Sequence, residues 1–429
     1  MGASVRSLAE ACLRDGFQVW CADQFADADL MATVGKDRVI LLTQGRPDTA
    51  ELARFPDDAW VVPVGGLESN ETLLQELQAA GRRVAAESAV VKRVRNPNLL
   101  FSAMQSHGIA VPRWCTHIAD VPSEGRWLKK NSYASGGLHV ECANRSVAER
   151  HNDHDGWYFQ ERLNGISCSA TFVSQRSADG STEARLLGCT LQLSGRSELN
   201  APGFAYCGNA GPLNLRDDLK KAIVQAGNIV QQQFLPRGVF GIDFIISDGQ
   251  PFLLEVNPRV TASHELLEHT SAVQSSLIRL HVQDFAGDDS AAASPPHPSD
   301  SLAKHFDAGN PRDCYARLVL YTPLDIDVTA AFTETMMKWN GALRSTGRFE
   351  RVADIPTPTQ QLSAGSPLCS LYVKLEAAAD GSERPFTPSW LPDIATLLPS
   401  FRLSSRVPEL CRQVQAEIRS LETDREIRN

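Results

Sequence analysis

The segment that most constrains the fold spans residues 238–259 and reads GVFGIDFIISDGQPFLLEVNPR. Two apolar runs flank an Asp-Gly dipeptide, which predicts a β-hairpin with a tight turn. Because strand side chains alternate between faces, one face is expected to be apolar, and its members are Ile242, Phe244, Ile246, Phe252, Leu254 and Val256. The two strands bring these side chains together only if the connection holds an odd number of residues or a β-bulge shifts the register.

The opposite face of this hairpin carries Asp243, Glu255 and Asn257. Two converging carboxylates repel each other unless a positive charge lies between them. Oxygen ligands of this kind favour Mg²⁺ or Mn²⁺, and Mg²⁺ usually completes its shell with waters and nucleotide phosphates. The alternative is an edge hairpin with one solvated polar face. The following Arg259 and a second motif upstream favour the metal site.

The second motif spans residues 127–140 and reads WLKKNSYASGGLHV. A short strand that carries Lys130 enters a loop of small residues, which include Ser135, Gly136 and Gly137. Small residues let backbone N–H groups approach phosphate oxygens, and a nearby lysine supplies the compensating charge. The spacing differs from that of the strand-to-helix P-loop.

The composition limits the class of protein and its partners. A chain of 429 residues is expected to form two or three domains, and its net charge of −9 argues against general nucleic-acid binding. Its ten cysteines include no CxxC pair, and the chain has neither a bilayer-spanning apolar run nor a signal-peptide core. We therefore predict a cytoplasmic protein with reduced thiols and small-molecule partners, which binds neither nucleic acid nor membranes. A homodimer is a further partner hypothesis, but the sequence does not fix the oligomeric state.

Helix and strand patterns alternate through the first 95 residues, which predicts an N-terminal doubly wound α/β domain at 1–95. The expected elements are helices at 7–15 and 71–80 and strands at 17–23, 38–43 and 60–64. The first strand of such a unit is expected upstream of the first helix, where the sequence has only a glycine turn. No GxGxxG fingerprint marks a dinucleotide site.

The rest of the chain predicts an α+β domain at 96–286, a linker at 287–312 and a small β-rich domain with a terminal helix at 313–429. The middle domain is expected to have helices at 96–108, 219–234 and from 264 towards 284, strands at 166–173 and 186–193, and a glycine-rich loop at 204–212. Short strands broken by Pro and Gly suggest a barrel-like last unit, and its terminal helix is expected at about 407–421. The predicted fold class is thus mixed α/β and α+β.

In this order, the pieces resemble the ATP-grasp superfamily, and within it carboxylate-amine ligases of the tyramine–glutamate ligase type, with distant similarity to biotin carboxylase. The motifs that carry the resemblance are the Lys130 strand with its Ala-Ser-Gly-Gly loop, the turn Gln160-Glu161-Arg162-Leu163, and the hairpin set Asp243, Glu255, Asn257 and Arg259. Together they cover about residues 96–270. The resemblance implies a pre-ATP-grasp domain at 1–95 and an ATP-grasp domain of two antiparallel α+β subdomains.

The resemblance also implies a role for each motif. ATP is expected between two antiparallel sheets, with its phosphates held by Lys130 and by the backbone at Ser135, Gly136 and Gly137. The turn is expected to bind the adenine edge through main-chain groups, and its residues are Gln160, Glu161, Arg162 and Leu163.

The hairpin is expected to hold two Mg²⁺ ions through Asp243, Glu255 and Asn257. Arg259 is expected to clamp a substrate carboxylate or the transferring phosphoryl group as the catalytic residue. Its alternative role is a structural ion pair with one of the two acids. The implied reaction is formation of an amide from a carboxylate and an amine through an acyl phosphate, in the biosynthesis of a one-carbon-carrier cofactor.

The sequence departs from the family pattern at several positions. Pro97 stands where the first ATP-binding lysine is usual, and Lys92, Arg93 or Arg95 are candidates to supply that charge. Asn131 stands where the family often has proline, and no acid follows the adenine turn where a ribose-binding carboxylate is usual. These departures keep open a non-catalytic ATP-binding module.

Two further alternatives are weaker. Biotin carboxylases have a glutamate base eight residues after the second metal carboxylate, and Ser263 occupies that position here, followed by a candidate acid/base, His264. The chain also lacks the Met-Lys-Met signature of a biotin carrier, so carboxylation is less favoured. An NAD-dependent oxidoreductase is disfavoured because the dinucleotide fingerprint is absent.

Overall fold

The structure is a computed structural model, and it describes residues 1–43, 45–67, 70–143, 156–176, 181–270, 277–286, 314–345, 349–375 and 402–422. The predicted linker at 287–312 lies outside these residues. Among the described helices, none is both long and apolar enough to cross a membrane.

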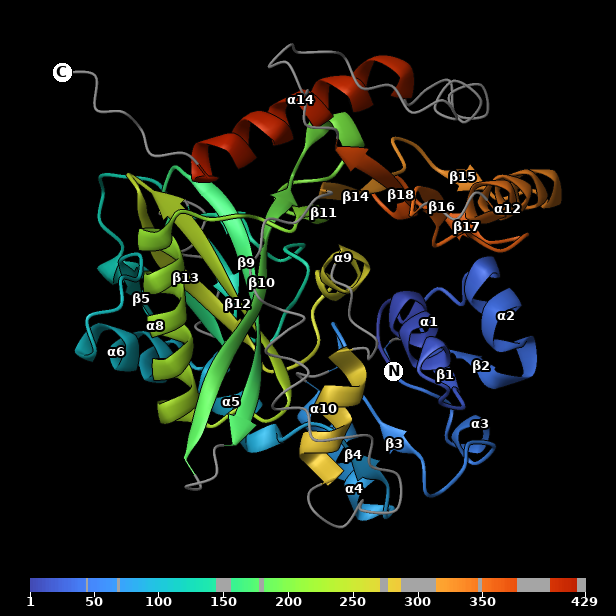
Figure 1. The fold of residues 1–429 in the computed structure, drawn as a ribbon, viewed down its shortest axis with the longest axis horizontal. Helices are drawn as coiled ribbons and strands as arrows, with labels where there is room; N and C mark the ends of the chain where they lie inside the picture. The colour runs from blue at the N-terminus through green and yellow to red at the C-terminus, as the bar shows by residue number, and fades with distance from the viewer. Residues whose placement is uncertain are drawn as a thin grey trace.

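The N-terminal unit is built from short parallel strands and helices, coloured blue in Figure 1. Its elements are α1 (Arg6–Arg14), β1 (Cys21–Asp23), α2 (Ala28–Val34), β2 (Val39–Leu41), α3 (Thr49–Leu52), β3 (Trp60–Val61), α4 (Glu71–Ala79) and β4 (Arg83–Val84). The pairs β1–β2 and β3–β4 are parallel, as expected of a doubly wound unit, although the strands are shorter than predicted. Gly2 forms a parallel bridge with Asp23 and so extends β1–β2 on the other side.

A small antiparallel sheet follows, in the order β5-β8-β6-β7. Its strands are β5 (Trp114–Cys115), β6 (Trp127–Asn131), β7 (Glu141–Cys142) and β8 (Trp157–Glu161), preceded by α5 (Ser88–Arg95) and α6 (Pro97–Ser106). Asn96 caps α6 by accepting a hydrogen bond from the Leu99 N–H, and Pro97 occupies the first turn, where it costs no hydrogen bond.

The main sheet has eight strands in the order β13-β12-β9-β10-β11-β14-β18-β16. The strands are β9 (Ile166–Arg176), β10 (Thr182–Ser194), β11 (Tyr206–Gly211), β12 (Val239–Ser247), β13 (Gln250–Asn257), β14 (Cys314–Tyr321), β16 (Arg351–Ala353) and β18 (Pro367–Leu375). The amphipathic helix α8 (Asp217–Phe234) packs against one face through Leu219, Ile223 and Val230. The largest core cluster lies here.

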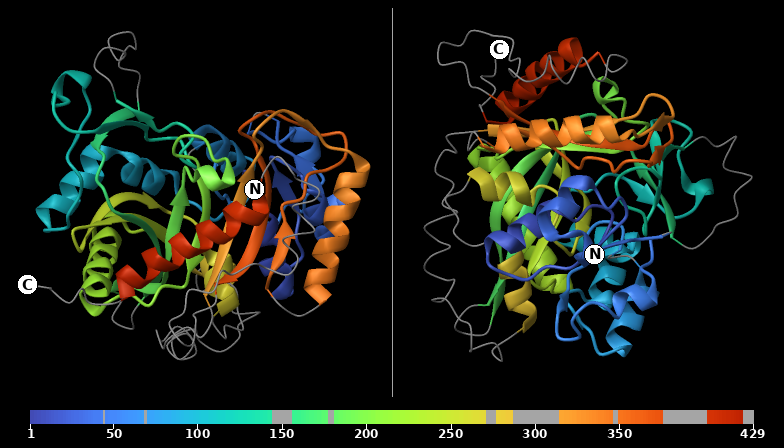
Figure 2. Two further views of the ribbon diagram at one scale, coloured as in Figure 1. Left: turned by 90° about the horizontal axis from the view of Figure 1, so that it is seen from above. Right: turned by 90° about the vertical axis from the view of Figure 1, so that its right-hand side faces the viewer.

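The remaining elements border the main sheet. They are α9 (His264–Thr270), α10 (Leu277–Ala286), β15 (Ile326–Asp327), α12 (Ala330–Ser345), β17 (Gln361–Leu362) and α14 (Leu403–Glu422). The helix predicted from residue 264 is thus described as α9 and α10, and residues 271–276 lie outside the description. The terminal helix is confirmed as α14, and Figures 1 and 2 show α12 and β16 beside the N-terminal unit.

Two predictions for the main sheet are wrong. The glycine-rich segment 204–212 contains strand β11, and a Cβ on Gly208 would lie 1.9 Å from the Arg317 oxygen of β14, so glycine permits this close approach. The last strands also form no separate barrel, because β14 pairs with β11 and continues the same sheet. The edge of β11 supplies backbone partners that the sequence pattern does not reveal.

The opening hairpin contains the predicted bulge. A two-residue turn, Asp248-Gly249, joins β12 and β13, and the register shifts between Asp243 and Phe244. Phe244 therefore faces Leu253, which is fully buried, whereas Leu254 lies in the bulge and lines a cavity. The predicted apolar face was wrong at Phe252 and Leu254, because parity alone does not locate the bulge.

Candidate active site

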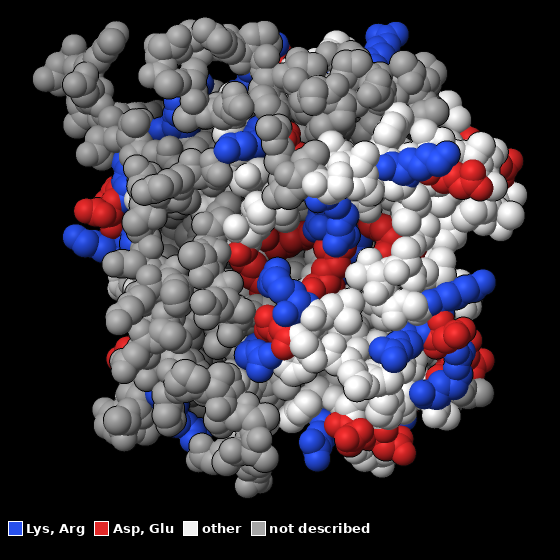
Figure 3. All heavy atoms as spheres, turned by 45° about the vertical axis from the view of Figure 1, so that its right-hand side comes forward, with Lys and Arg blue, Asp and Glu red and all other residues white. Residues whose placement is uncertain are grey.

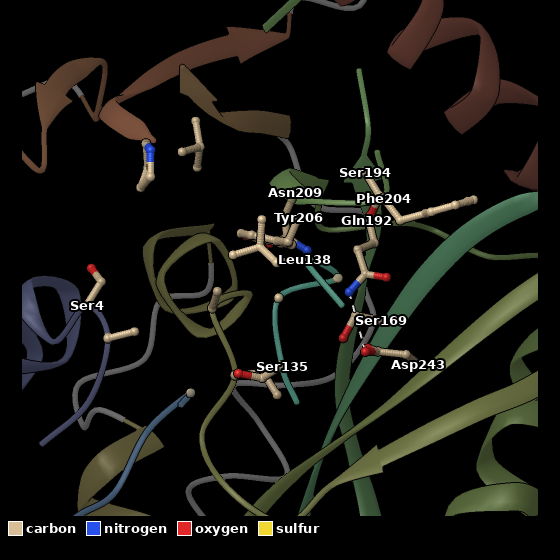
Figure 4. Close-up of a pocket in the computed structure, with 18 of the residues that line it drawn as sticks. Ser4, Ser135, Leu138, Ser169, Gln192, Ser194, Phe204, Tyr206, Asn209 and Asp243 are labelled. Carbon is tan, nitrogen blue, oxygen red and sulfur yellow. Dashed lines mark hydrogen bonds between the residues drawn. The ribbon is translucent and has the colours of Figure 1, made fainter. Parts of the chain in front are cut away.

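A cavity of about 1150 Å³ lies between the two sheets and the N-terminal unit. It is large enough for a nucleotide with a second ligand, since small-molecule pockets usually measure about 300–1,000 Å³. Figure 3 shows carboxylates in the hollow and basic side chains at its rim. Figure 4 shows Ser4 of the N-terminal unit across the cavity from Asp243 of the main sheet.

The cavity brings together the three residues predicted to bind metal. Asp243 lies on β12, and Glu255 and Asn257 lie on β13. The Asn257 Nδ2 donates hydrogen bonds to Asp243 Oδ2 and to Glu255 Oε1, both at 3.2 Å. Gln192 of β10 donates to Asp243 Oδ2 at 3.4 Å, and Figure 4 shows these two side chains pointing toward each other.

The electrostatics of the two acids differ. Burial, together with the neighbouring Glu255 carboxylate, raises the pKa of Asp243 to about 7. Burial also acts to raise the pKa of Glu255, but Arg95 and Lys130 outweigh it and lower this pKa to about 2. A buried and a half-buried carboxylate with pKa values displaced in opposite directions mark a site where further positive charge is favourable.

A divalent cation fits the donors of this set. Asp243 is only 6% exposed, and its Oδ1 is buried without a hydrogen bond to any residue that the structure describes. The described residues contain no group of three or more His, Cys, Asp or Glu arranged for a metal, so water or phosphate oxygens would complete the shell. The Asn257 Oδ1 faces Arg95 at 2.9 Å and Arg259 at 3.4 Å. A half-turn of this amide would present its oxygen to the carboxylates.

Arg95 is the one of the three candidate cations that reaches this set. It is 7% exposed, and its NH1 lies 3.7 Å from Glu255 Oε2. Lys92 instead pairs with the exposed Glu71, and Arg93 donates to the carbonyl oxygen of Gln233. The helical spacing of four residues from the buried Val91 to Arg95 is a signal that could have singled out this arginine.

Lys130 enters the cavity from the small sheet. Its Nζ donates to Gln160 Oε1 at 3.2 Å and lies 5.8 Å from the centre of the Tyr158 ring. Burial acts to lower the pKa of Lys130, but Tyr158 and Glu255 outweigh it, so the pKa is raised. The lysine therefore stays charged and ready to bind an anion.

The small-residue loop is attached to the start of β11. Gly136 and Gly137 both have φ of +74°, and the Gly136 oxygen accepts the Tyr206 N–H at 2.8 Å. A Cβ on Gly137 would lie 2.1 Å from the Phe204 oxygen, so this position requires glycine. Ser135 lines the cavity beside them.

The predicted adenine turn has a mixed outcome. The main-chain N–H groups of Glu161 and Arg162 donate to the backbone oxygens of Arg113 and Arg126, both at 2.8 Å, so they are not available to a base. The Glu161 carboxylate is bound by Arg113 through two hydrogen bonds of 2.9 and 2.8 Å. The Leu163 N–H donates to no described residue. An adenine contact through the Leu163 N–H stays a prediction.

Comparison with known families agrees with this geometry. A family model described as the ATP-grasp domain matches residues 95–263.

Residues 95–263 form an ATP-grasp domain. The resemblance drawn from the Lys130, Gln160 and Asp243 motifs is thereby confirmed at the level of the superfamily. Over 76 residues the chain is also 29% identical to the uncharacterized protein MJ0776 of Methanocaldococcus jannaschii. That match spans 18% of this chain and only 19% of the relative.

Solved structures share the fold over most of the chain. An L-amino acid ligase from Bacillus licheniformis matches with a TM-score of 0.60 and 13% identity, covering 94% of this chain and 96% of that one. An N5-carboxyaminoimidazole synthetase from Staphylococcus aureus, complexed with ADP, matches with a TM-score of 0.56 and 12% identity, covering 92% and 94%.

A third similar structure is the biotin carboxylase domain of Hydrogenobacter thermophilus 2-oxoglutarate carboxylase, in complex with MgADP. It matches with a TM-score of 0.58 and 12% identity, covering 86% of this chain and 84% of that one. At these identities the three structures establish the fold alone.

Arg259 links the ATP-grasp domain to the N-terminal unit. Its NH1 donates to the Val260 oxygen at 3.2 Å, and its NH2 donates to Asn257 Oδ1 at 3.4 Å. A Cβ added to Gly65 would lie 3.5 Å from the same NH2. The guanidinium therefore lies where the two parts of the molecule meet at the cavity.

His264, at the start of α9, faces the same cavity of the ATP-grasp domain. Its ring is 3% exposed, and Nδ1 lies 2.9 Å from the Thr261 carbonyl oxygen, which requires a proton on Nδ1. The Nε2 of the neutral ring then carries a lone pair, and this atom is buried without a hydrogen bond to a described residue. His264 is therefore a buried residue of the cavity wall and not a surface histidine.

A second charged cluster, which we term the Arg6 network, was not anticipated from sequence. Its members are Arg6, Glu265, Arg317, Arg351, Asp354 and Tyr372. Arg6 Nε donates to Asp354 Oδ1 and Arg6 NH2 to the Tyr372 hydroxyl, both at 2.7 Å. Arg6 NH1 lies 3.3 Å from Glu265 Oε1. The network ties α1 to α9 and to the last strands of the main sheet. No local motif signals it, because its members are far apart in the chain.

Proposed function

We propose that the chain is an ATP- and Mg²⁺-dependent ligase that joins a carboxylate to an amine through an acyl phosphate and releases ADP and phosphate. The observation that carries the proposal is the unsatisfied Asp243 oxygen beside Glu255, in one cavity with Lys130 and the small-residue loop. The similar solved structures that contain ADP or MgADP support the choice of nucleotide.

The residues present fit both ATP and the metal. Asp243, Glu255 and, after rotation of its amide, Asn257 would hold Mg²⁺, which supplies charge neutralisation for phosphoryl transfer. Lys130 would bind phosphate oxygens, and the backbone at Ser135, Gly136 and Gly137 would cover them.

The reaction we propose has two balanced steps. A carboxylate oxygen of the acid substrate attacks the γ-phosphorus of ATP, and the bond to the ADP oxygen breaks. The amine nitrogen then attacks the acyl carbon, and phosphate leaves with the bonding electrons. Arg259 would hold the carboxylate during the first step because a guanidinium can pair with both of its oxygens.

The amine must lose a proton in the second step, and we assign this role to His264. His264 lines the cavity, its Nε2 accepts no hydrogen bond from a described residue, and the Thr261 carbonyl holds the ring in the required tautomer.

Carboxylation of biotin is the less favoured alternative. The Ser263 hydroxyl, at the position of the expected glutamate base, lies 2.8 Å from the Thr261 hydroxyl and 3.1 Å from the Thr171 hydroxyl. A hydroxyl in such a chain is a poor substitute for a carboxylate base. The narrower proposal of a ligase in one-carbon-carrier biosynthesis rests on the sequence resemblance, and cytoplasmic location and a homodimer remain predictions.

The test is a phosphate-release screen with ATP and Mg²⁺ over pairs of acids and amines, including pterin and furan precursors. We expect equal amounts of ADP, phosphate and amide, and release only when both substrates are present. Omission of either substrate is the control. ATP binding without ADP release across the whole panel would instead support a non-catalytic module.

A further inference from the structure

The acidic wall of the cavity opposite the main sheet contains one carboxylate that accepts no hydrogen bond from a described residue. Asp23, Asp27 and Asp29 of the N-terminal unit lie close to Asp354, which follows β16. Besides burial, the Asp354 carboxylate raises the pKa of each of these three acids. Only Asp27 and Asp354 line the cavity.

Three of the four acids have clear structural partners. Asp23 accepts the backbone N–H groups of Val5, Phe25 and Ala26 at 2.7 to 2.8 Å. Asp29 accepts the N–H groups of Asp354 and Ile355 at 3.0 and 2.9 Å, and Asp354 pairs with Arg6 and Arg317. These bonds hold the wall together.

Asp27 differs from the other three. It precedes α2, where an aspartate usually accepts a hydrogen bond from the first turn, but its side chain makes no such bond. It accepts no hydrogen bond from any other residue that the structure describes, yet it is only 5% exposed and lines the cavity. A carboxylate in such a place is costly unless a cation meets it.

We propose that Asp27 binds an ammonium group of a substrate, one that takes no part in the bond-forming step. This proposal rests on the ligase function proposed above and specifies its substrate class: either the acid is an amino acid, or the amine carries a second amino group. An ammonium suits the site because it needs separate acceptors rather than converging carboxylates, and Ser4 and Ser7 offer hydroxyl groups in the same cavity. A metal is disfavoured because backbone N–H groups engage Asp23 and Asp29 and two arginines engage Asp354, so Asp27 has no second free carboxylate with which to share an ion.

The charge on the wall agrees with this role. Burial, followed by Asp354, Asp23 and Asp29, raises the pKa of Asp27 well above its ordinary value. A carboxyl with a folded-state pKa above its unfolded value reduces stability at every pH above the unfolded value. Without substrate, Asp27→Asn should therefore be at least as stable as the wild type at pH 7. A structural role predicts the opposite.

The experiment measures binding of matched probes to the full chain by isothermal titration calorimetry. One pair is L-glutamate and glutarate, and the other is 1,4-diaminobutane and 1,4-butanediol, so that the first pair tests the acid as source of the ammonium and the second tests the amine. We expect wild type to prefer one ammonium probe over its partner by tenfold or more, and Asp27→Asn to reduce this preference to less than twofold. The control is Asp248→Asn, the same change in the exposed β12–β13 turn, which should bind like wild type.

Three results would overturn the proposal: equal binding of both members of each pair to wild type, an undiminished preference in Asp27→Asn, or a clear loss of thermal stability in that variant. MgATP is titrated separately in the same proteins. Failure of wild type to bind MgATP, with ammonium binding retained, would contradict the proposed ligase function and leave the ammonium site intact.

Discussion

The two charged clusters of the cleft differ in how completely their groups are paired. In the Arg6 network, Arg6 and Arg317 outweigh burial and lower the pKa of Asp354, and Arg6 and Arg351 do the same for Glu265. In the hairpin set, burial and Glu255 raise the pKa of Asp243, and one of its oxygens is unsatisfied among the described residues. A paired cluster stabilises the fold, whereas an unsatisfied one gains most from a ligand.

Asp243→Asn is expected to show the difference between the two clusters most clearly, because it should reduce activity without reducing stability. The variant keeps the shape of the side chain but loses the charge that we propose binds the metal, so we expect kcat/KM to fall by about 10³-fold or more, equivalent to about 4 kcal/mol. Because the pKa of Asp243 is raised, the free energy of unfolding at pH 8 should stay equal or increase. The ADP-release assay and urea denaturation measure the two quantities. Full activity in this variant would remove Asp243 from the metal site.

The reverse pattern is expected for Arg6→Met. Removal of this fully buried guanidinium takes away one of the two arginines that pair with each of Asp354 and Glu265, and we expect the free energy of unfolding to fall by about 3–5 kcal/mol. Urea denaturation at pH 7 measures the loss. Arg412→Met is the matched control, because it breaks only an exposed pair with Glu409 and should cost less than about 1 kcal/mol.

His264 and Glu265 are neighbours at the start of α9, but His264 lines the cavity and Glu265 belongs to the Arg6 network. Their variants should therefore differ in whether activity or stability is lost. His264→Asn should lower kcat by about 10²-fold with little change in stability, since its Nε2 makes no hydrogen bond to a described residue that the variant would lose. Glu265→Gln should destabilise the protein by about 2–3 kcal/mol, since this carboxylate belongs to the Arg6 network. Initial rates and urea denaturation distinguish the two. Equal destabilisation by both changes would argue that His264 is structural.

The smallest effect concerns acid pH. A carboxyl with a folded-state pKa below its unfolded value stabilises the fold above the unfolded pKa, and this contribution is lost as the pH falls through the folded pKa. The lowered pKa values of Asp354 and Glu265 therefore predict that wild type loses stability as the pH falls below about 4, near the ordinary values of these acids. Urea midpoints at pH 5, 4 and 3 test this, and Arg6→Met should show a weaker dependence. An identical pH dependence in both proteins would contradict the assignment.

The same contrast explains what could be predicted from sequence. The hairpin set comes from one short segment, so alternation of side chains and a required bulge were sufficient to place Asp243 beside Glu255. Arg6 and Tyr372 are 366 residues apart, and no local period links them. The exact position of the bulge, and hence the burial of Leu253 instead of Leu254, also depends on tertiary packing.

Strand β11 shows a second limit of sequence patterns. Its glycines predict a loop by composition, but at Gly208 the absence of a side chain lets β14 approach. By contrast, the predicted strand that leads into the turn at residues 160–163 is present as β8. The pairing of their N–H groups could not be predicted, because it depends on the partners Arg113 and Arg126.

The separation of Arg6 from Tyr372 also bears on the order of folding. Contacts between residues far apart in the chain close long loops, so they form late and slow folding. The hairpin at residues 238–259 can form as soon as it leaves the ribosome, whereas Arg6 must wait for β18 to be synthesised. Until then, the acidic wall around Asp27 and the guanidinium of Arg6 remain in water. The cleft is therefore completed by one of the last events of folding.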